Sequence, residues 1–322
     1  MTTQPPRTTA ADADEPLARP HWAPLTLVCF AYLAATVGEQ VLSPVFPTTA
    51  DDLDLSESAG GIAFGTLAAS IAVANLVGGA LLRRLGVARV LTLAALASTI
   101  GSVLAALAPG FGLLVVAQVF LGVGAGFFFP AGLQAVALFA GPTRKGFAMG
   151  IYGVAFSGGL TLAALLGTLG ASQGWRSAFW ASAALSGAAV VVSLTLRVHA
   201  TVSGPSQRVP LRVILGLPTL VGSIGAVCQY GAIPFLTTFA VAEWDMSKAG
   251  AAAVLAVGRV ISIVAKLVSG AGADRVGPRA SARSTGMVLV VTGLAWVLLP
   301  GGWIAYALAA IFAGTVSSVF PV

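Results

Sequence analysis

The chain contains two copies of one sequence pattern, separated by a constant offset of 191 residues. Asp54 and Ser56 recur as Asp245 and Ser247. Further matched positions are Gly79 with Gly270, Arg84 with Arg275, Gly86 with Gly277, Pro109-Gly110 with Pro300-Gly301, and Phe129-Pro130 with Phe320-Pro321. Self-similarity at one fixed period predicts two units of the same fold. The chain ends at Val322, which corresponds to Ala131, so we expect the second unit to be cut short.

The composition indicates that both units lie in a membrane. Charged residues make up 9% of the chain and the mean hydropathy is +0.94, whereas soluble domains contain about 25% charged residues. Long apolar runs separated by short polar loops are typical of transmembrane helices. The net charge of +6 is not gathered on one soluble face, so we expect no nucleic-acid partner. Cys29 and Cys228 lie in apolar runs, and neither a disulfide nor a metal site is expected.

Ten apolar runs predict membrane-spanning helices. They cover residues 24–46, 58–82, 89–108, 111–137, 147–170, 176–196, 213–240, 249–271, 283–299 and 303–322. Because lipid offers no hydrogen-bond partner to an open backbone, we expect an all-α polytopic membrane protein. Its expected parts are a disordered cytoplasmic tail (1–23), an N-terminal six-helix bundle (24–197), a central cytoplasmic linker (198–212), and a C-terminal bundle that holds helices 7–10 only (213–322).

The distribution of Lys and Arg predicts the orientation in the membrane. With the N-terminus in the cytoplasm, most of the 17 basic residues fall in the tail and the inner loops. Only Arg176 and Lys248 then fall in outer loops, and the outer segments 51–54 and 243–245 are acidic. Cytoplasmic loops are enriched in Lys and Arg. We therefore expect a multi-pass protein of the plasma (inner) membrane with a cytoplasmic N-terminus.

Two matched inner loops carry glycine and arginine at the same spacing. The first reads Gly79-Ala-Leu-Leu-Arg83-Arg84-Leu-Gly86 and the second reads Gly270-Ala-Gly-Ala-Asp274-Arg275-Val-Gly277. Glycine permits a tight turn, and arginine at the membrane face can reach the interface and pair with a carboxylate such as Asp274. The pattern fits either an ionic latch or basic loops that only mark the inner side.

The second loop resembles the G-x-x-x-D-R-x-G-R-[RK] signature of the major facilitator superfamily. The segment 174–179, Gly-Trp-Arg-Ser-Ala-Phe, resembles the family's G-W-R-x-x-F at the start of helix six. Residues 143–150 resemble its R-G-x-A-x-G entry to helix five. The resemblance covers the chain after residue 23, and it implies two like halves that move a small-molecule substrate by alternating access. It also implies a cytoplasmic gate made by Gly79, Arg83, Arg84, Gly86, Gly270, Asp274, Arg275 and Gly277.

Three positions depart from the pattern of this family. Arg83 stands where the family usually has aspartate, so the first loop lacks its carboxylate. Gln118 stands where many proton-coupled members have a buried arginine in helix four. Ala163-Ala164 stands where antiporting exporters often have Gly-Pro. These departures argue against a proton-driven drug antiporter.

Two ionisable residues lie deep in predicted spans, Glu39 in the first and Arg259 in the eighth. Placing such a charge in a membrane costs on the order of 3 kcal/mol, so a function is the default interpretation. For Glu39 the alternatives are contact with outer water or a bond to a neighbouring residue. For Arg259 they are a structural ion pair or a contact with unwound backbone. Under the repeat, Tyr230 corresponds to Glu39. We expect a polar cavity for substrate and coupling ion lined by Glu39, Gln40, Gln118, Gln134, Tyr152, Gln229, Tyr230 and Arg259.

These features favour secondary active transport of a small organic solute, coupled to protons or another ion, by a monomer. No Walker loop and no enzyme-like cluster of side chains is found in the sequence, so we expect neither ATP, nor a cofactor, nor catalysis. In this interpretation Arg259 contacts an anion or acts as a counter-charge, and Glu39 binds a proton or cation. The alternative is a non-transporting fragment or remnant that acts only in membrane-protein assembly or regulation.

Overall fold

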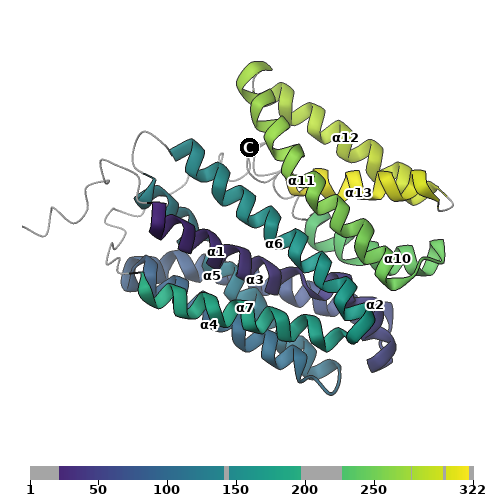
Figure 1. Cartoon of the computed structure of the whole chain (residues 1–322), viewed down its shortest axis with the longest axis horizontal. Coiled ribbons are helices and arrows are strands. Elements are labelled where there is room, and N and C mark those ends of the chain that lie inside the picture. The colour runs from purple at the N-terminus through teal and green to yellow at the C-terminus, as the bar shows by residue number, and fades with distance from the viewer. Residues whose placement is uncertain (1–21, 141–144, 197–226, 277, 300–301, 319–322) are drawn as a thin grey trace, which may run out of the picture.

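The computed structural model describes residues 22–140, 145–196, 227–276, 278–299 and 302–318, all within helices or the short turns between them (Figure 1). These residues contain no strand. The predicted all-α class is therefore confirmed. The predicted tail, the linker 198–212, and the start of the seventh span lie outside the described residues.

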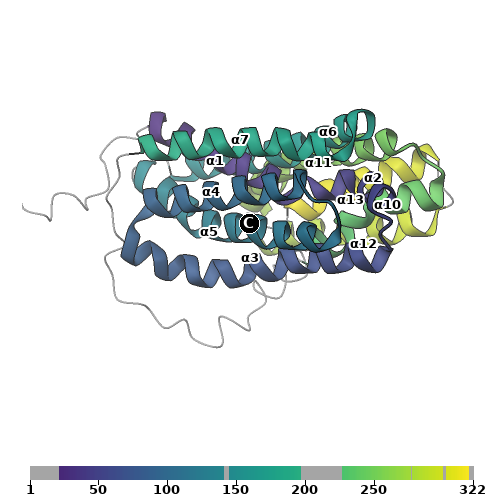
Figure 2. The same ribbon diagram turned by 90° about the horizontal axis from the view of Figure 1, so that it is seen from below.

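The first half contains six membrane-length segments. They are α1 (Trp22–Gln40) with α2 (Leu42–Leu53), α3 (Glu57–Leu85), α4 (Val87–Ala106), α5 (Phe111–Phe139), α6 (Lys145–Gln173) and α7 (Trp175–Thr195). The first segment is helical to Leu53, seven residues beyond the predicted end at 46, and it is interrupted only at Val41. Figure 2 shows these helices running side by side along the longest axis of the molecule.

The second half contains five described helical segments. They are the π-helix η2 (Cys228–Ala232), α10 (Ile233–Trp244), α11 (Lys248–Val276), α12 (Pro278–Leu298) and α13 (Trp303–Ser318). A π-helix has one residue more per turn than its surroundings, and such turns are frequent at functional sites. In this chain it carries Gln229 and Tyr230.

The repeat read from the sequence is consistent with the helix boundaries. Both bounds of α2 are matched by those of α10, and both bounds of α3 by those of α11, at the offset of 191 residues. The residues that end α2 and α10, Asp54 and Asp245, have φ angles of 49° and 48°. Aspartate is one of the few residues besides glycine that adopts this left-handed conformation readily. Local sequence therefore builds the same helix end in both halves.

Close packing in the first half depends on small residues. A Cβ on Gly122 would lie 2.6 Å from the carbonyl oxygen of Leu67, and one on Gly126 would lie 2.7 Å from that of Ile71. Only glycine allows α5 to approach α3 so closely, which suits membrane helices that associate by van der Waals packing. Gly86, with a φ of 78°, forms the turn between α3 and α4 on its own.

Seven of the described helices are long and apolar enough to cross a membrane. Two shorter apolar helices, Arg283–Leu298 and Trp303–Val316, cover the ninth and tenth predicted spans. The described residues thus form a multi-pass membrane protein.

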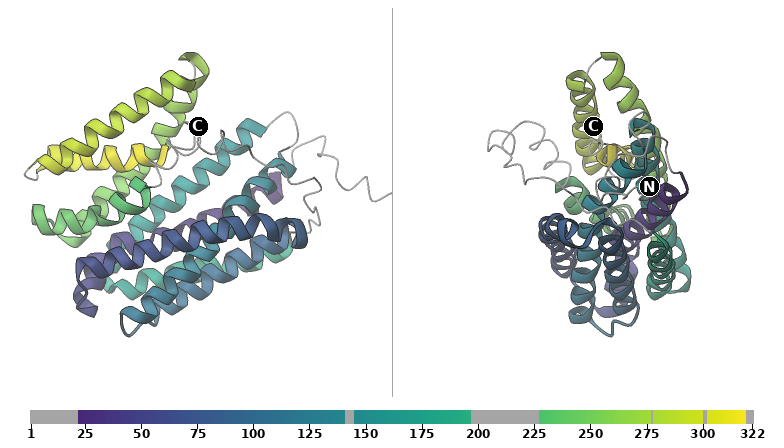
Figure 3. Two further views of the ribbon diagram at one scale, coloured as in Figure 1. Left: turned by 180° about the vertical axis from the view of Figure 1, so that it is seen from behind. Right: turned by 90° about the vertical axis from the view of Figure 1, so that its left-hand side faces the viewer.

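The two halves contact each other most extensively where α6 packs against α11, and also where α2 packs against α10 and α11. In Figures 1 and 3 the ribbons of α11 and α12 diverge from those of the first half toward the end where α3 joins α4. Every hydrogen bond recorded between the halves, within the described ranges, joins residues 39–51 to residues 229–259. The site described next lies at this junction.

Candidate substrate and coupling site

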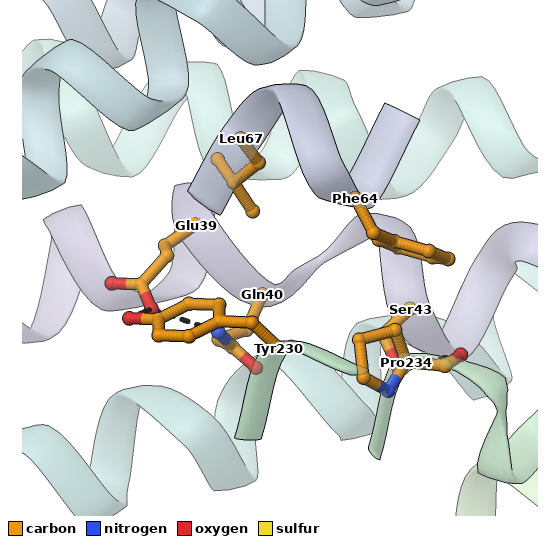
Figure 4. Close-up of a pocket in the computed structure, with 7 residues that line it drawn as sticks. All are labelled: Glu39, Gln40, Ser43, Phe64, Leu67, Tyr230 and Pro234. Atoms are coloured by element: carbon orange, nitrogen blue, oxygen red, sulfur yellow. Dashed lines mark hydrogen bonds between the residues drawn. The ribbon is translucent and has the colours of Figure 1, made fainter. Parts of the chain in front are cut away.

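Glu39 lies at the end of α1, two residues before the break at Val41, and only 7% of its surface is exposed. Its Oε1 atom accepts a hydrogen bond of 2.8 Å from the hydroxyl of Tyr230 and another of 2.8 Å from Nε2 of Gln40 (Figure 4). Tyr230 belongs to the second half. The two residues related by the repeat therefore meet directly across the junction.

Arg259 lies in the middle of α11 and is 1% exposed. Its NH2 group donates to Oε1 of Gln40 over 3.3 Å, and its NH1 group donates to Oε1 of Gln229 over 3.4 Å. Gln229 also donates from Nε2 to Oε1 of Gln40 over 3.1 Å. A continuous chain of hydrogen bonds thus runs from the carboxylate of Glu39, through Gln40, to the guanidinium of Arg259.

Proline and the π-helix explain why these side chains meet. Pro44 and Pro234 have no N–H group, so the α-helical bonds to the carbonyls of Gln40 and Tyr230 cannot form. Pro47 likewise leaves the carbonyl of Ser43 without its usual donor. The hydroxyl of Thr237 donates to that carbonyl over 2.8 Å. Broken helices at mid-depth of a transporter are tolerated where they line a cavity or face other protein.

The network holds one formal negative and one formal positive charge. Neither ion pair found among the described residues joins Glu39 to Arg259, although the two interact electrostatically. A buried charge without compensation is costly. The neutral amides of Gln40 and Gln229 therefore stabilise Arg259 at short range, and Glu39 balances its charge from farther away.

A cavity of about 10 Å³ borders this network, a volume on the order of one water molecule. Its polar side chains are Glu39, Gln40, Ser43 and Tyr230, and its apolar ones are Phe64, Leu67 and Pro234. Phe64 and Leu67 of α3 lie on one side, whereas Pro234 lies beside Ser43 (Figure 4). The arrangement leaves no room for an organic solute as it stands. A solute could enter only if side chains or the two halves move.

The side of the site toward Asp51 and Lys248 is closed by contacts between the halves. The hydroxyl of Ser43 is 3.3 Å from the carbonyl oxygen of Pro234. Phe46, Phe64 and Phe235 pack with ring centroids 5.3–6.4 Å apart. Beyond them Lys248 pairs with Asp51 at the surface. Ser43 and Thr237 were not predicted as site residues from the sequence. Ser43 directly precedes Pro44, and Thr237 follows Pro234 by three residues.

The structure brings five of the eight predicted cavity residues into one network, namely Glu39, Gln40, Gln229, Tyr230 and Arg259. The other three lie elsewhere in the first half. Tyr152 stacks on Tyr32 with ring centroids 4.1 Å apart. Gln118 is fully buried and its amide has no hydrogen-bond partner. Gln134 is half-buried.

The predicted gate residues are described only in part. Arg83 and Arg84 end α3 with exposed side chains and take part in neither of the ion pairs of the described residues. Gly79 is half-buried in α3. Gly270, Asp274 and Arg275 lie in α11, but their side chains, together with Gly277, lie outside the described residues. The inner latch therefore stays a prediction.

A two-fold repeated helical bundle with a buried polar network at the junction of its halves is the architecture of a secondary transporter. A sequence model of the Major Facilitator Superfamily matches residues 28–322, and the chain belongs to this family. The resemblance inferred from the motifs is thereby confirmed.

One curated relative is described as the probable sulfoacetate transporter SauU of Cupriavidus necator. It is 29% identical over 156 residues, which are 48% of this chain and 36% of the relative. The match thus spans about a third of the relative's length.

Solved structures of transporters share the fold. A bacterial homolog of the human lysosomal transporter Spinster, in an inward-facing and occupied conformation, superimposes with a TM-score of 0.69 at 18% identity, covering 92% of this chain and 72% of that one. The nucleoside transporter NupG gives 0.70 at 14% identity, covering 92% and 80%. A D-xylose–proton symporter gives 0.68 at 15% identity, covering 93% and 80%. At these identities the likeness shows the fold.

Proposed function

We propose that the protein is a secondary active transporter that moves a small organic anion through the junction of its halves, coupled to protons. The observation that carries this proposal is the buried hydrogen-bonded chain from Glu39 to Arg259, which links the two halves. Ionisable side chains at such depth are costly and are kept where they bind substrate or ions.

Arg259 supports an anionic substrate. Its guanidinium donates to the amide oxygens of Gln40 and Gln229 over 3.3 and 3.4 Å. Hydrogen bonds from arginine to carboxylates are about 2.7–2.9 Å long and roughly twice as strong as neutral ones. An anionic oxygen would therefore replace an amide oxygen with a gain in free energy. The curated relative is named for sulfoacetate, a molecule with a sulfonate and a carboxylate.

Glu39 supports proton coupling. With Glu39 ionised, its charge and that of Arg259 cancel, and an incoming anion would leave the site with net negative charge. With Glu39 protonated, one negative group of the anion neutralises Arg259 instead, and the occupied site is one unit less negative. In a medium of low dielectric constant the less charged combination is favoured. Proton and anion should therefore bind together, and by linkage each tightens the other's binding by the same factor.

Movement of the halves supplies the two access states of this proposal. The contacts between α2 and α10 close one side, while the ribbons diverge toward the other (Figure 3). We place the divergent side in the cytoplasm of a plasma-membrane monomer because the inner loops are basic. In this arrangement residues 24–197 and 213–322 are the moving bundles, residues 198–212 link them, and the loops at Arg84 and Arg275 form the opposite gate.

The proposal is tested by binding and uptake with the purified chain in liposomes. Sulfoacetate should bind and accumulate when the proton gradient is inward, whereas neutral D-xylose should do neither. Glu39→Gln should retain binding but lose its pH dependence, because the site then carries one net positive charge at every pH. Glu243→Gln, the same change at an exposed position, is the control and should behave as the parent.

Failure of inserted, folded protein to bind any organic anion would remove the anion assignment. Failure both to bind and to transport any solute would favour the alternative of a non-transporting remnant, which no present observation favours.

Orientation has its own test. Single cysteines replacing Arg144 and Lys248 should react with an impermeant reagent from opposite sides of the membrane, with position 248 labelled from outside. Labelling of position 248 only from the cytoplasmic side would reverse the assigned topology.

A further inference from the structure

Gln40 occupies a central place in the buried network. It is 6% exposed and follows Glu39 directly in the chain. Its Nε2 atom donates to Glu39 on the same half, while its Oε1 atom accepts from Gln229 and Arg259 on the other half. No other described side chain contacts both Glu39 and Arg259 by hydrogen bonds.

The chemistry of its neighbours fixes the orientation of the Gln40 amide. A guanidinium has only donors, so the amide oxygen must face Arg259. An ionised carboxylate has only acceptors, so the amide nitrogen must face Glu39. Gln229 is constrained in the same way, because its own oxygen faces Arg259 and its nitrogen must then turn to Gln40. The whole chain is therefore ordered by the charge at each end.

Protonation of Glu39 removes the reason for this order. The bond from Gln40 to Glu39 loses its charge assistance, which accounts for about half of its strength. The amide is then less firmly held, and so is the oxygen that it presents to Arg259. The bonds of Arg259 to the amide oxygens are already long, at 3.3 and 3.4 Å. A carboxylate or sulfonate oxygen can then bind the guanidinium of Arg259 without competition from a firmly held Gln40 amide.

We infer that Gln40 is the positioning residue that couples the protonation of Glu39 to the availability of Arg259 for an anionic substrate. This inference rests on the proposed function, since it gives the route by which proton and anion affect each other. Gln40 acts through its neighbours. While Glu39 is ionised, the amide oxygen of Gln40 is held against the guanidinium of Arg259. When Glu39 is protonated, this oxygen releases the guanidinium.

Other ionisable groups also surround Glu39. Tyr230 in η2 donates to the same carboxylate oxygen. Tyr32 in α1 and Arg259 in α11 interact with it electrostatically. Tyr152 of α6 stacks on Tyr32. None of the three tyrosines contacts Arg259 through a recorded hydrogen bond, although Tyr230 interacts with it electrostatically. Gln40 is the side chain whose recorded hydrogen bonds join Glu39 to Arg259.

The test replaces Gln40 by methionine, which has a similar length and no amide. The readout is the ratio of sulfoacetate dissociation constants at the alkaline and acid plateaus of the pH profile. We expect about a hundredfold in the parent, within the usual range of coupling between sites. In Gln40→Met the ratio should fall to tenfold or less while binding at acid pH is kept.

Gln229→Met is the matched control. Gln229 also bonds Arg259 and Gln40 but does not touch Glu39. This variant removes a competing amide oxygen from Arg259 at every pH, so it should bind sulfoacetate at least as tightly as the parent throughout and keep the parental ratio. An unchanged ratio in Gln40→Met, or an equal loss in both variants, would overturn the role of Gln40.

A measurement without substrate separates this inference from the proposed function. Infrared difference spectra report the protonated carboxyl of Glu39, assigned by its absence in Glu39→Gln. Arg259→Gln should shift the midpoint of this titration, and the shift should shrink by at least half when Gln40→Met is also present. A shift of the same size in both backgrounds would contradict the relay, whichever solute the protein carries.

Discussion

Charged residues join the halves in two different settings, a buried polar network and an exposed ion pair. Glu39 and Arg259 are 7% and 1% exposed and are separated by neutral amides. Lys248 and Asp51 pair directly, with side chains 32% and 69% exposed. The buried charges have no direct ion pair with each other, and the directly paired charges lie in water.

This difference indicates distinct roles. Water already solvates an exposed pair, so its formation contributes about 0–1 kcal/mol. A buried network has no such alternative, and removing one charged partner typically costs about 3–5 kcal/mol. Lys248 also stands at the positive end of the α11 dipole, and Asp51 at the negative end of the α2 dipole. Each is unfavourable in its own helix, and pairing across the halves offsets this.

The largest effect is expected at Arg259. Arg259→Gln should weaken sulfoacetate binding by at least about a hundredfold, because a loss of about 3 kcal/mol at a buried charge corresponds to this factor. Transport per inserted molecule should fall to background. Arg283→Gln, at an exposed position in α12, should bind and transport as the parent. Normal transport by Arg259→Gln, normalised to the amount inserted, would return Arg259 to a structural role.

A smaller effect is expected at Tyr230. Tyr230→Phe removes one hydrogen bond of 2.8 Å to Glu39 without changing the ring. A hydrogen bond to a charged group contributes about 1.5–3 kcal/mol, so the acid limb of the pH profile should shift toward higher pH. The comparison is Tyr306→Phe, whose ring packs against Trp244 away from the network. Identical pH profiles for the two variants would mean that Tyr230 does not act on Glu39.

The smallest effect is expected at the exposed ion pair between Lys248 and Asp51. Lys248→Gln loses the pair with Asp51 but also relieves the repulsion between a cation and the α11 dipole. These contributions are of similar size and opposite sign. The free energy of unfolding should change by less than about 1 kcal/mol, and less still at high salt. A loss of several kcal/mol at Lys248 would show that the exposed pair holds the halves together.

Much of the fold could be predicted from local sequence. The apolar runs predicted the helices because helix length in a membrane follows hydrocarbon thickness. The offset of 191 residues predicted two units of the same fold, and the bounds of α10 and α11 match those of α2 and α3 at this offset. The left-handed conformation of Asp54 and Asp245 was found only in the structure. The first span was predicted to end at 46 because the acidic residues beyond it are polar, but helix formation continues to Leu53.

The candidate site could be predicted only in part. Glu39 and Arg259 were visible as charges in apolar sequence, and the repeat pointed from Glu39 to Tyr230. Gln118 carried the same sequence signal as Gln40, yet it is buried elsewhere in the first half. Hydropathy reports that a polar residue lies in a span but does not report which helix face it occupies or which helix it meets.

The sequence by itself therefore determined the membrane class, the helices, their repetition and the residues that carry charge. These properties depend on interactions with lipid and on bonds between residues close in the chain. Only the tertiary structure decided that Gln40 stands between Glu39 and Arg259. It also decided that Lys248 of one half pairs with Asp51 of the other. These contacts join residues about 200 positions apart, and they arise from the packing of the two halves, which no local pattern encodes.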